Sequence, residues 1–189
     1  TLMMNFPPEI AAGVILIGCV PCGVSSNILN FLSKGNLALS ITLTSFATIM
    51  APFITPVLMQ KLAGQFIPID ILGMMFSISK MIFLPLILGI VFNRIFGKRS
   101  SWLNSAMPLL AMTANVIIIA IIVAAGRDSL LNIGLLLFLA AAIHNATGYL
   151  LGYWGGRLFK LNKRDSRTIA IEVGLQNGGM AAGIAFELG

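Results

Sequence analysis

Charged residues, histidine and cysteine are all scarce in this sequence. Asp, Glu, Lys and Arg together make up 10% of its 189 residues, whereas soluble domains carry about 25%. The single histidine and the two cysteines are too few for a structural zinc site, which takes about four ligands, and two cysteines define no disulfide framework. Because 58% of the residues are hydrophobic and the mean hydropathy is +0.97, we predict an integral membrane protein.

The hydrophobic residues form six runs, each near or above the ~20 residues that a membrane-spanning helix needs. They cover residues 9–32, 37–63, 71–96, 103–125, 130–159 and 168 to the end. Pro21 and Gly23 disfavour a helix at residues 19–26, which leaves half-helices at 9–18 and 25–32. We expect Pro85 to separate a short interfacial helix from a span, and residues 126–129 and 160–167 to be loops.

The basic residues between these runs alternate in number. The first, third and fifth loops together hold nine Lys and Arg residues, whereas the second and fourth hold two. Cytoplasmic loops of membrane proteins carry the excess of Lys and Arg. The odd-numbered loops are therefore predicted to be cytoplasmic, and both ends of the chain are predicted to lie on the outer face.

Residues 172–179 (EVGLQNGG) interrupt the last run with a carboxylate, two carboxamides and three glycines. An ionisable residue at membrane depth is costly, and broken backbone survives there only where protein buries it or where it lines a wet cavity. The break near Pro21 is its counterpart, and the loop charges make the two broken spans run in opposite directions. Such a pair is typical of a transporter site built on inverted repeats.

The polar atoms near the two breaks suit an alkali cation, because hard cations prefer oxygen ligands. Side-chain oxygens come from Ser25, Ser26, Asn27, Ser40, Thr44, Gln176 and Asn177. Glu172 would add negative charge, and the backbone of residues 173–175 would add carbonyl oxygens. The half-helix N-termini near Ser25 and Asn177 carry partial positive charge, which favours an anionic substrate group. For Ser40 and Thr44 alone, ordinary hydrogen bonding between membrane helices is the alternative interpretation.

At these residues the chain resembles the bile acid:sodium symporter family. The matching stretches are residues 23–27 (GVSSN), 34–45 (KGNLALSITLTS), 144–145 (HN), 148–152 (GYLLG) and above all 171–177 (IEVGLQN). The resemblance implies an all-α, polytopic membrane protein of the inverted-repeat transporter fold, with two discontinuous helices that cross at the binding site. It implies ten helices, of which the six spans would be the fourth to ninth. The chain would then be a fragment, with core-domain helices at residues 1–63, panel-domain helices at 64–126 and core-domain helices at 127–189.

The resemblance also implies ligands. One sodium site would fall on Ser26, Asn27, Ser40, Thr44 and Glu172. A second would use Glu172, the backbone of Val173 and Leu175, and the Gln176 side chain. Organic anions, the substrates of the family, would contact Val24, Ser25 and Asn177. Several relatives have a hydroxyl residue where this chain has Val24, so a substrate contact would be lost or altered.

These observations predict a sodium-coupled symporter of an organic anion, either bile-acid-like or a small carboxylate, that works by alternating access in the bacterial inner membrane. Na⁺ would be co-transported from two sites, and neither nucleic acid nor an obligate protein partner is expected. A proton-coupled antiporter of similar architecture is the alternative, although it would want paired acidic groups where this sequence has Glu172 alone. We expect no enzyme, because His144 lies in a different span from the best serines.

Overall fold

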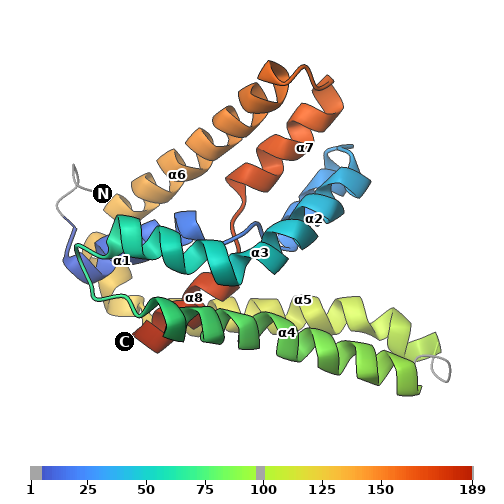
Figure 1. Cartoon of the computed structure of the whole chain (residues 1–189), viewed down its shortest axis with the longest axis horizontal. Helices are drawn as coiled ribbons and strands as arrows, with labels where there is room; N and C mark the ends of the chain where they lie inside the picture. Colours follow the sequence, from blue (N-terminus) through green and yellow to red (C-terminus); the bar gives the residue numbers. More distant parts are fainter. Residues whose placement is uncertain (1–5, 97–100, 189) are drawn as a thin grey trace.

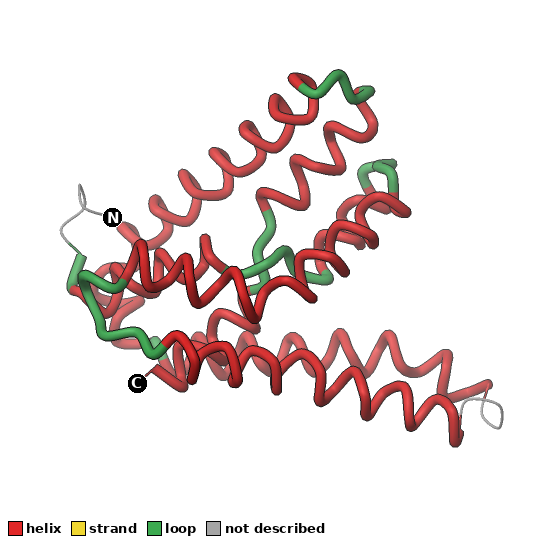
Figure 2. The backbone as a smooth tube through the Cα atoms, viewed as in Figure 1, coloured by secondary structure: helices red, strands yellow, loops and turns green. Residues whose placement is uncertain are grey.

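The structure is built from helices. The computed structural model describes residues 6–96 and 101–188 and contains eight helices in them (Figures 1 and 2). They are α1 (Pro8–Cys19), α2 (Ser25–Leu32), α3 (Leu37–Ala63), α4 (Ile71–Phe96), α5 (Ser101–Ala125), α6 (Arg127–Leu158), α7 (Lys163–Gly174) and α8 (Gly178–Leu188). The prediction of an all-α protein is confirmed.

Several predicted helix ends agree with the structure. α2 and α3 begin and end at the predicted residues, α4 spans the whole apolar run predicted at 71–96, and α1 extends the predicted half-helix by one residue at each end. α3 continues through Pro52 and Pro56. The hydrophobic runs and the glycine and proline positions were therefore sufficient to locate the first half of the chain's elements.

Three local predictions are wrong. Pro85 lies inside the continuous helix α4, and no separate interfacial helix precedes it; in membrane helices neighbouring groups satisfy the backbone that a proline frees. Residues 127–129 form the first turn of α6, where the Asp128 carboxylate is favourable at a helix N-terminus. α7 begins at Lys163 rather than at residue 168, because the side chain of Asn162 accepts a hydrogen bond from the amide of Asp165 and caps the helix.

The two broken segments meet at their breaks. α1 and α2 are separated by residues 20–24, and α7 and α8 by residues 175–177. Cys22 and Gln176 pair as an isolated antiparallel bridge, in which the Gly23 amide donates to the Leu175 carbonyl at 3.4 Å and the Asn177 amide donates to the Pro21 carbonyl at 2.8 Å. The backbone groups that the breaks free thus satisfy one another across the contact, as the interior of a membrane protein requires.

One hydrophobic cluster holds α1, α3, α4 and α8 together. Its buried members include Leu16 of α1, Met59 of α3, Ile78 of α4 and Ile184 of α8. α6 and α7 form a hairpin on the other side of the crossing breaks, and α7 also contacts α2 and α3 (Figure 1). The breaks therefore lie between a packed hydrophobic layer and the α6–α7 hairpin.

Three helices in the described part of the chain are long and apolar enough to cross a membrane by themselves, at residues 37–62, 71–95 and 130–158. α1 and α8 are apolar but shorter, and each is half of a broken segment. In Figure 1 the α2–α3 and α6–α7 turns and the end of α4 lie at one end of the molecule, while the start of α1, the end of α8 and the other two turns lie at the opposite end. This arrangement separates odd-numbered from even-numbered loops, as the loop charges predict; Lys98 and Arg99 of the third loop lie outside the described residues.

Candidate ion-binding site

Glu172 is the charged centre of a buried polar cluster. It lies in the last turn of α7, before the break, and only 7% of the residue is exposed. Its Oε1 accepts hydrogen bonds from Ser40 Oγ at 2.5 Å and Asn30 Nδ2 at 3.1 Å, and its Oε2 accepts one from Thr44 Oγ1 at 2.8 Å. A buried carboxylate needs such donors because it has lost its water. Helices α2, α3 and α7 therefore meet at one carboxylate.

The other ligands predicted for the first sodium site surround this carboxylate. Asn27 Oδ1 lies within hydrogen-bonding distance of the same two hydroxyls, 2.8 Å from Ser40 Oγ and 3.4 Å from Thr44 Oγ1. Ser26 Oγ donates to the Gly23 carbonyl at 2.8 Å and lies 3.5 Å from Thr44 Oγ1. The structure thus brings together five side chains that are spread over almost 150 residues of sequence: Ser26, Asn27, Ser40, Thr44 and Glu172.

The hydroxyl groups of this cluster have more acceptors within reach than hydrogens to donate. Ser40 Oγ lies within bonding distance of both Glu172 Oε1 and Asn27 Oδ1. Thr44 Oγ1 reaches Glu172 Oε2, Asn27 Oδ1 and, at 3.0 Å, the Ser40 carbonyl. Each hydroxyl donates only one hydrogen bond. When both donate to the carboxylate, neither serves Asn27, so the cluster holds surplus oxygen lone pairs beside a negative charge.

Two further side chains of the cluster were missed by sequence reasoning. Asn30 is fully buried, and its Nδ2 donates to both Ser40 Oγ, at 2.9 Å, and Glu172 Oε1. The signal was its spacing of four residues from Ser26, which puts both on one face of α2. Cys22, at the first break, lies beside Glu172 and Thr44 and adds a weak thiol donor; nothing in the sequence separated it from an ordinary packing residue.

The residues predicted for the second sodium site lie at the second break. The Val173 carbonyl accepts a hydrogen bond from the side-chain amide of Gln176 at 2.7 Å, and the Leu175 carbonyl accepts from the Gly23 amide. Among the described residues no hydrogen bond joins the Gln176 side chain to Glu172. These two carbonyls therefore already have donors within the crossing, and the side chain of Gln176 turns back on its own helix end.

The three residues predicted to contact substrate lie at or next to the two breaks. Val24 and Ser25 are exposed at the start of α2, and Asn177 is half-buried directly before α8. Asn177 Oδ1 accepts from the Met180 amide at 3.0 Å and caps α8. A Cβ on Gly23 would lie 3.4 Å from Asn177 Cα, so the N-terminal ends of α2 and α8 come close together.

Known proteins are similar to this chain over most of its length. The family model described as the Sodium Bile acid symporter family matches residues 1–133. The chain belongs to this family. It is 39% identical over 182 residues to the "Uncharacterized sodium-dependent transporter YocS" of Bacillus subtilis (strain 168). The aligned region covers 96% of this chain and 57% of that relative.

Plant relatives extend the comparison. The "Probable sodium/metabolite cotransporter BASS1, chloroplastic" of Arabidopsis thaliana is 36% identical over 98% of this chain and 46% of its own length. The corresponding BASS2 of Oryza sativa subsp. japonica is 33% identical over 95% of this chain and 42% of its own length. The chain therefore spans about half the length of these relatives. The names of these relatives describe transporters rather than enzymes. This chain, a member of the sodium bile acid symporter family, is a multi-pass integral membrane protein.

A row of glycines positions the Glu172 helix in this symporter-family chain. A Cβ on Gly148, Gly152 or Gly156 of α6 would meet the backbone of α7 at 2.9, 2.8 and 3.1 Å. Small residues at such a four-residue spacing let the backbones of two membrane helices approach closely. Because α7 carries Glu172, this contact fixes the height and distance at which the carboxylate faces α2 and α3.

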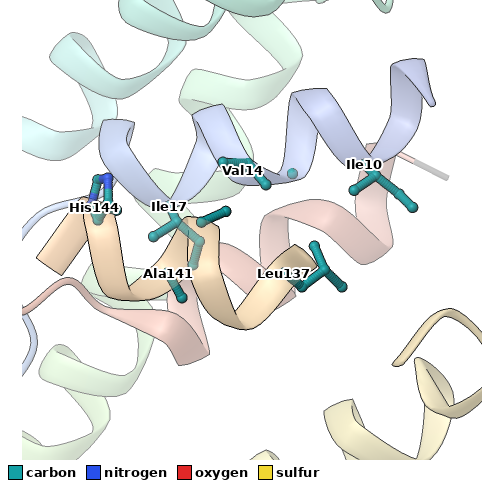
Figure 3. A pocket seen from close by; sticks show the side chains of 8 residues that line it. Ile10, Val14, Ile17, Leu137, Ala141 and His144 are labelled. Atoms are coloured by element: carbon teal, nitrogen blue, oxygen red, sulfur yellow. The ribbon is translucent and has the colours of Figure 1, made fainter. Parts of the chain in front are cut away.

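An apolar pocket of about 340 Å³ lies away from the polar cluster, between α1 and α6 (Figure 3). Its lining residues are Ile10, Gly13, Val14, Ile17, Leu137, Ala140, Ala141 and His144. His144 lies at one end, and its buried Nε2 has no hydrogen-bond partner among the described residues. The imidazole carbon Cε1 would lie 3.4 Å from a Cβ on Gly18, so His144 packs directly on α1. His144, which belongs to one of the stretches that resemble the family, thus lies at the α1–α6 contact and makes no hydrogen bond to the carboxylate cluster within the described residues.

Proposed function

We propose that the full-length protein is a sodium-coupled symporter of an organic anion, and that Na⁺ binds at the Glu172 cluster. The observation that carries the proposal is the surplus of oxygen acceptors around a buried carboxylate. A cation next to Asn27 Oδ1 and Glu172 would satisfy lone pairs that the two hydroxyl hydrogens cannot all serve. It would also offset the cost of burying the charge of Glu172, since buried charges need a partner.

The donor set fits Na⁺ as the transported cargo. Ser26, Asn27, Ser40, Thr44 and Glu172 offer oxygen only, which suits a hard cation. The thiol of Cys22 is a soft ligand and lies beside this set without matching the preference of Na⁺. A second sodium ion would lie between Glu172 and the second break. We propose that Val173, Leu175 and Gln176 hold it. The names of the relatives, sodium-dependent transporter and sodium/metabolite cotransporter, support the choice of ion.

We further propose that the anion binds where the N-termini of α2 and α8 converge. Both ends carry the partial positive charge of a helix N-terminus, and Val24, Ser25 and Asn177 lie there. The proposed anion site and the proposed cation site at Glu172 would then lie on neighbouring parts of the same two broken segments. Binding of Na⁺ would fix α2 and α7 on α3 and so preorganise the anion site.

Transport would proceed by alternating access of an inverted-repeat fold. The core domain, residues 1–63 and 127–189, would hold both sites and move against panel helices within residues 64–126. The antiparallel contact of the two breaks supports a crossing of discontinuous helices, the arrangement expected of such transporters. We place the protein in the bacterial inner membrane, with the relative from Bacillus subtilis as support.

Sodium binding can be tested without knowing the substrate. The melting temperature of the purified full-length protein is measured in NaCl and in choline chloride of equal ionic strength, since a ligand of the folded state stabilises it. We expect Na⁺ to raise the melting temperature of the wild type and to leave Glu172→Gln and Glu172→Ala unchanged. Glu187→Gln, which removes an exposed carboxylate at the end of α8, is the matched control and keeps the effect. Equal stabilisation of Glu172→Gln by Na⁺ would refute the assignment.

Coupling is tested in membrane vesicles with a labelled bile acid and a labelled monocarboxylate as the two probe anions. An inward Na⁺ gradient is expected to drive uptake of one of them, and Glu172→Gln to abolish it. Uptake that follows a proton gradient without Na⁺ would instead support a proton-coupled antiporter.

A further inference from the structure

We propose that Asn30 is a positioning residue for sodium, and that its carboxamide sets the affinity of the Glu172–Ser40 pair for the ion. This inference rests on the proposed function, because it concerns the same cluster. Asn30 was outside every set of ligands predicted from the sequence. Its role follows from three features of its surroundings: two donated hydrogen bonds, an unpaired oxygen and a rigid backbone.

The amide nitrogen of Asn30 makes two bonds into the site. Nδ2 donates to Ser40 Oγ at 2.9 Å and to Glu172 Oε1 at 3.1 Å, and an NH₂ group has a hydrogen for each. The lone pair of an amide nitrogen is delocalised into its carbonyl group and does not coordinate a cation, so Nδ2 is not a ligand. It instead occupies one lone pair on each oxygen and thereby fixes the direction in which the remaining lone pairs point. Groups that orient metal ligands in this way contribute strongly to affinity.

The carboxamide oxygen shows that packing alone does not account for an asparagine here. Asn30 is fully buried, and its Oδ1 makes no hydrogen bond within the described residues. An unsatisfied buried acceptor destabilises the fold, so a leucine of similar size would serve packing better. What asparagine adds at this place is the pair of bonds to Ser40 and Glu172.

The backbone around Asn30 holds the carboxamide in place. The Asn30 carbonyl accepts from the Gly35 amide at 2.8 Å and from Ser33 Oγ at 3.2 Å. A Cβ on Gly35 would lie 2.6 Å from Asn30 Oδ1. The turn between α2 and α3 therefore limits rotation of the carboxamide from behind, while Ser40 and Glu172 hold it from the front.

The test is a sodium titration of the melting temperature of the full-length protein, with choline chloride as balance. Asn30→Leu removes both donated hydrogen bonds and keeps the number and branching of the side-chain heavy atoms, and we expect its dissociation constant for Na⁺ to rise about 10- to 100-fold. Thr55→Val is the matched control: it removes another buried hydrogen bond, from Thr55 Oγ1 to the Cys19 carbonyl at 2.8 Å, outside the cluster. It should lower the melting temperature in choline and leave the sodium dissociation constant unchanged. An unchanged constant in Asn30→Leu would overturn the proposal.

Two further variants separate positioning from loss of structure. If Asn30 is a positioning residue, Asn30→Leu should reduce sodium affinity less in a Ser40→Ala background than in the wild type, because Ser40→Ala already removes one of the two hydrogen bonds of Asn30. Additive effects of the two substitutions would contradict this role. Gly35→Ala would bring a Cβ within 2.6 Å of Asn30 Oδ1 and within 2.8 Å of Thr168 Oγ1, without changing the chemistry of the carboxamide. It should weaken sodium binding as Asn30→Leu does, and unchanged binding would contradict the proposal where Asn30→Leu does not fold. If the wild type itself shows no sodium stabilisation, the proposed function fails rather than the role of Asn30.

Discussion

From the contact between α6 and α7 we predict that Gly152→Ala destabilises the protein and that Gly155→Ala, three residues further on, does not. A Cβ on Gly152 would lie 2.8 Å from Ala170 Cα and 2.9 Å from the Ile169 carbonyl oxygen, whereas ordinary contacts begin at 3.4 Å. These atoms belong to backbone and cannot rotate away, so Gly152→Ala must push the helices apart. Overpacking of this kind costs about 1–3 kcal/mol. Part of this cost is offset by about 1 kcal/mol, because alanine favours a helix over glycine.

Gly155 supplies the control that isolates the clash. It lies in the same helix, and a Cβ there would meet nothing within 4 Å. Gly155→Ala gains the same helix propensity without the contact, so its melting temperature should equal or exceed that of the wild type. At about 2–4 °C per kcal/mol for a domain of this size, the two variants should differ by roughly 2–12 °C. The assay is thermal unfolding of the full-length protein in detergent. If the two variants melt together, the close approach of α6 and α7 is not what holds the Glu172 helix.

Two more substitutions test the packing and the turn next to the site. Met59→Ala should lower the free energy of unfolding by about 2–5 kcal/mol, because Met59 is fully buried in the cluster of α1, α3, α4 and α8; chemical denaturation in detergent measures this, and a change under 1 kcal/mol would contradict such a core. Asn36→Ala should cost about 1–3 kcal/mol, since its side chain caps α3 and donates to Asp165 Oδ1 at 2.8 Å. Faster hydrogen exchange confined to the start of α3 and of α7 would show the loss, and unchanged exchange would contradict it.

The extent of the helices could be predicted because hydrophobic length and glycine or proline breaks are local features. α3 was predicted to the residue, whereas the run at 71–96 was predicted with the right outer ends but divided at Pro85, which was given too much weight as a helix breaker. The start of α7 was predicted five residues late, although Asn162 and Asp165 show the spacing of a reciprocal cap. The side chain of each bonds to the other residue, Asn162 Oδ1 to the Asp165 amide and Asn162 Nδ2 to Asp165 Oδ2 at 2.7 Å. A charged, polar stretch was read as a loop when it was the first turn of a helix.

Sequence reasoning predicted the side chains that gather around Glu172 but not the groups that support them. Glu172 is recognisable because a carboxylate inside an apolar run needs a reason. Asn30 carries no charge and lies in a half-helix that already offers Ser26 and Asn27, so its contribution became apparent only with the position of Ser40 and Glu172. Gly152 likewise attracts attention only once α7 lies against it. Asn30 acts through Ser40, ten positions away, and Glu172, 142 positions away, while Gly152 acts through Ala170 on the next helix; local patterns reveal none of these contacts.

The small free energy of the contact between the two breaks indicates how a cation at its proposed site on Glu172 would influence an anion at the proposed site beside the breaks. The two breaks are joined by two backbone hydrogen bonds, one of 2.8 Å and one of 3.4 Å. At about 0.5–1.5 kcal/mol net each, they fix the crossing only weakly. Coupling between two ligands typically amounts to about 1–3 kcal/mol, which is the same size. An ion that binds Ser40, Asn27 and Glu172 would hold α2, α3 and α7 together. To couple the two sites, its binding would need to stabilise the contact between the breaks by no more free energy than the two backbone hydrogen bonds already contribute. Glu172 is a suitable place for such a small energy to act, because hydrogen bonds from Asn30, Ser40 and Thr44 join α2, α3 and α7 at its carboxylate.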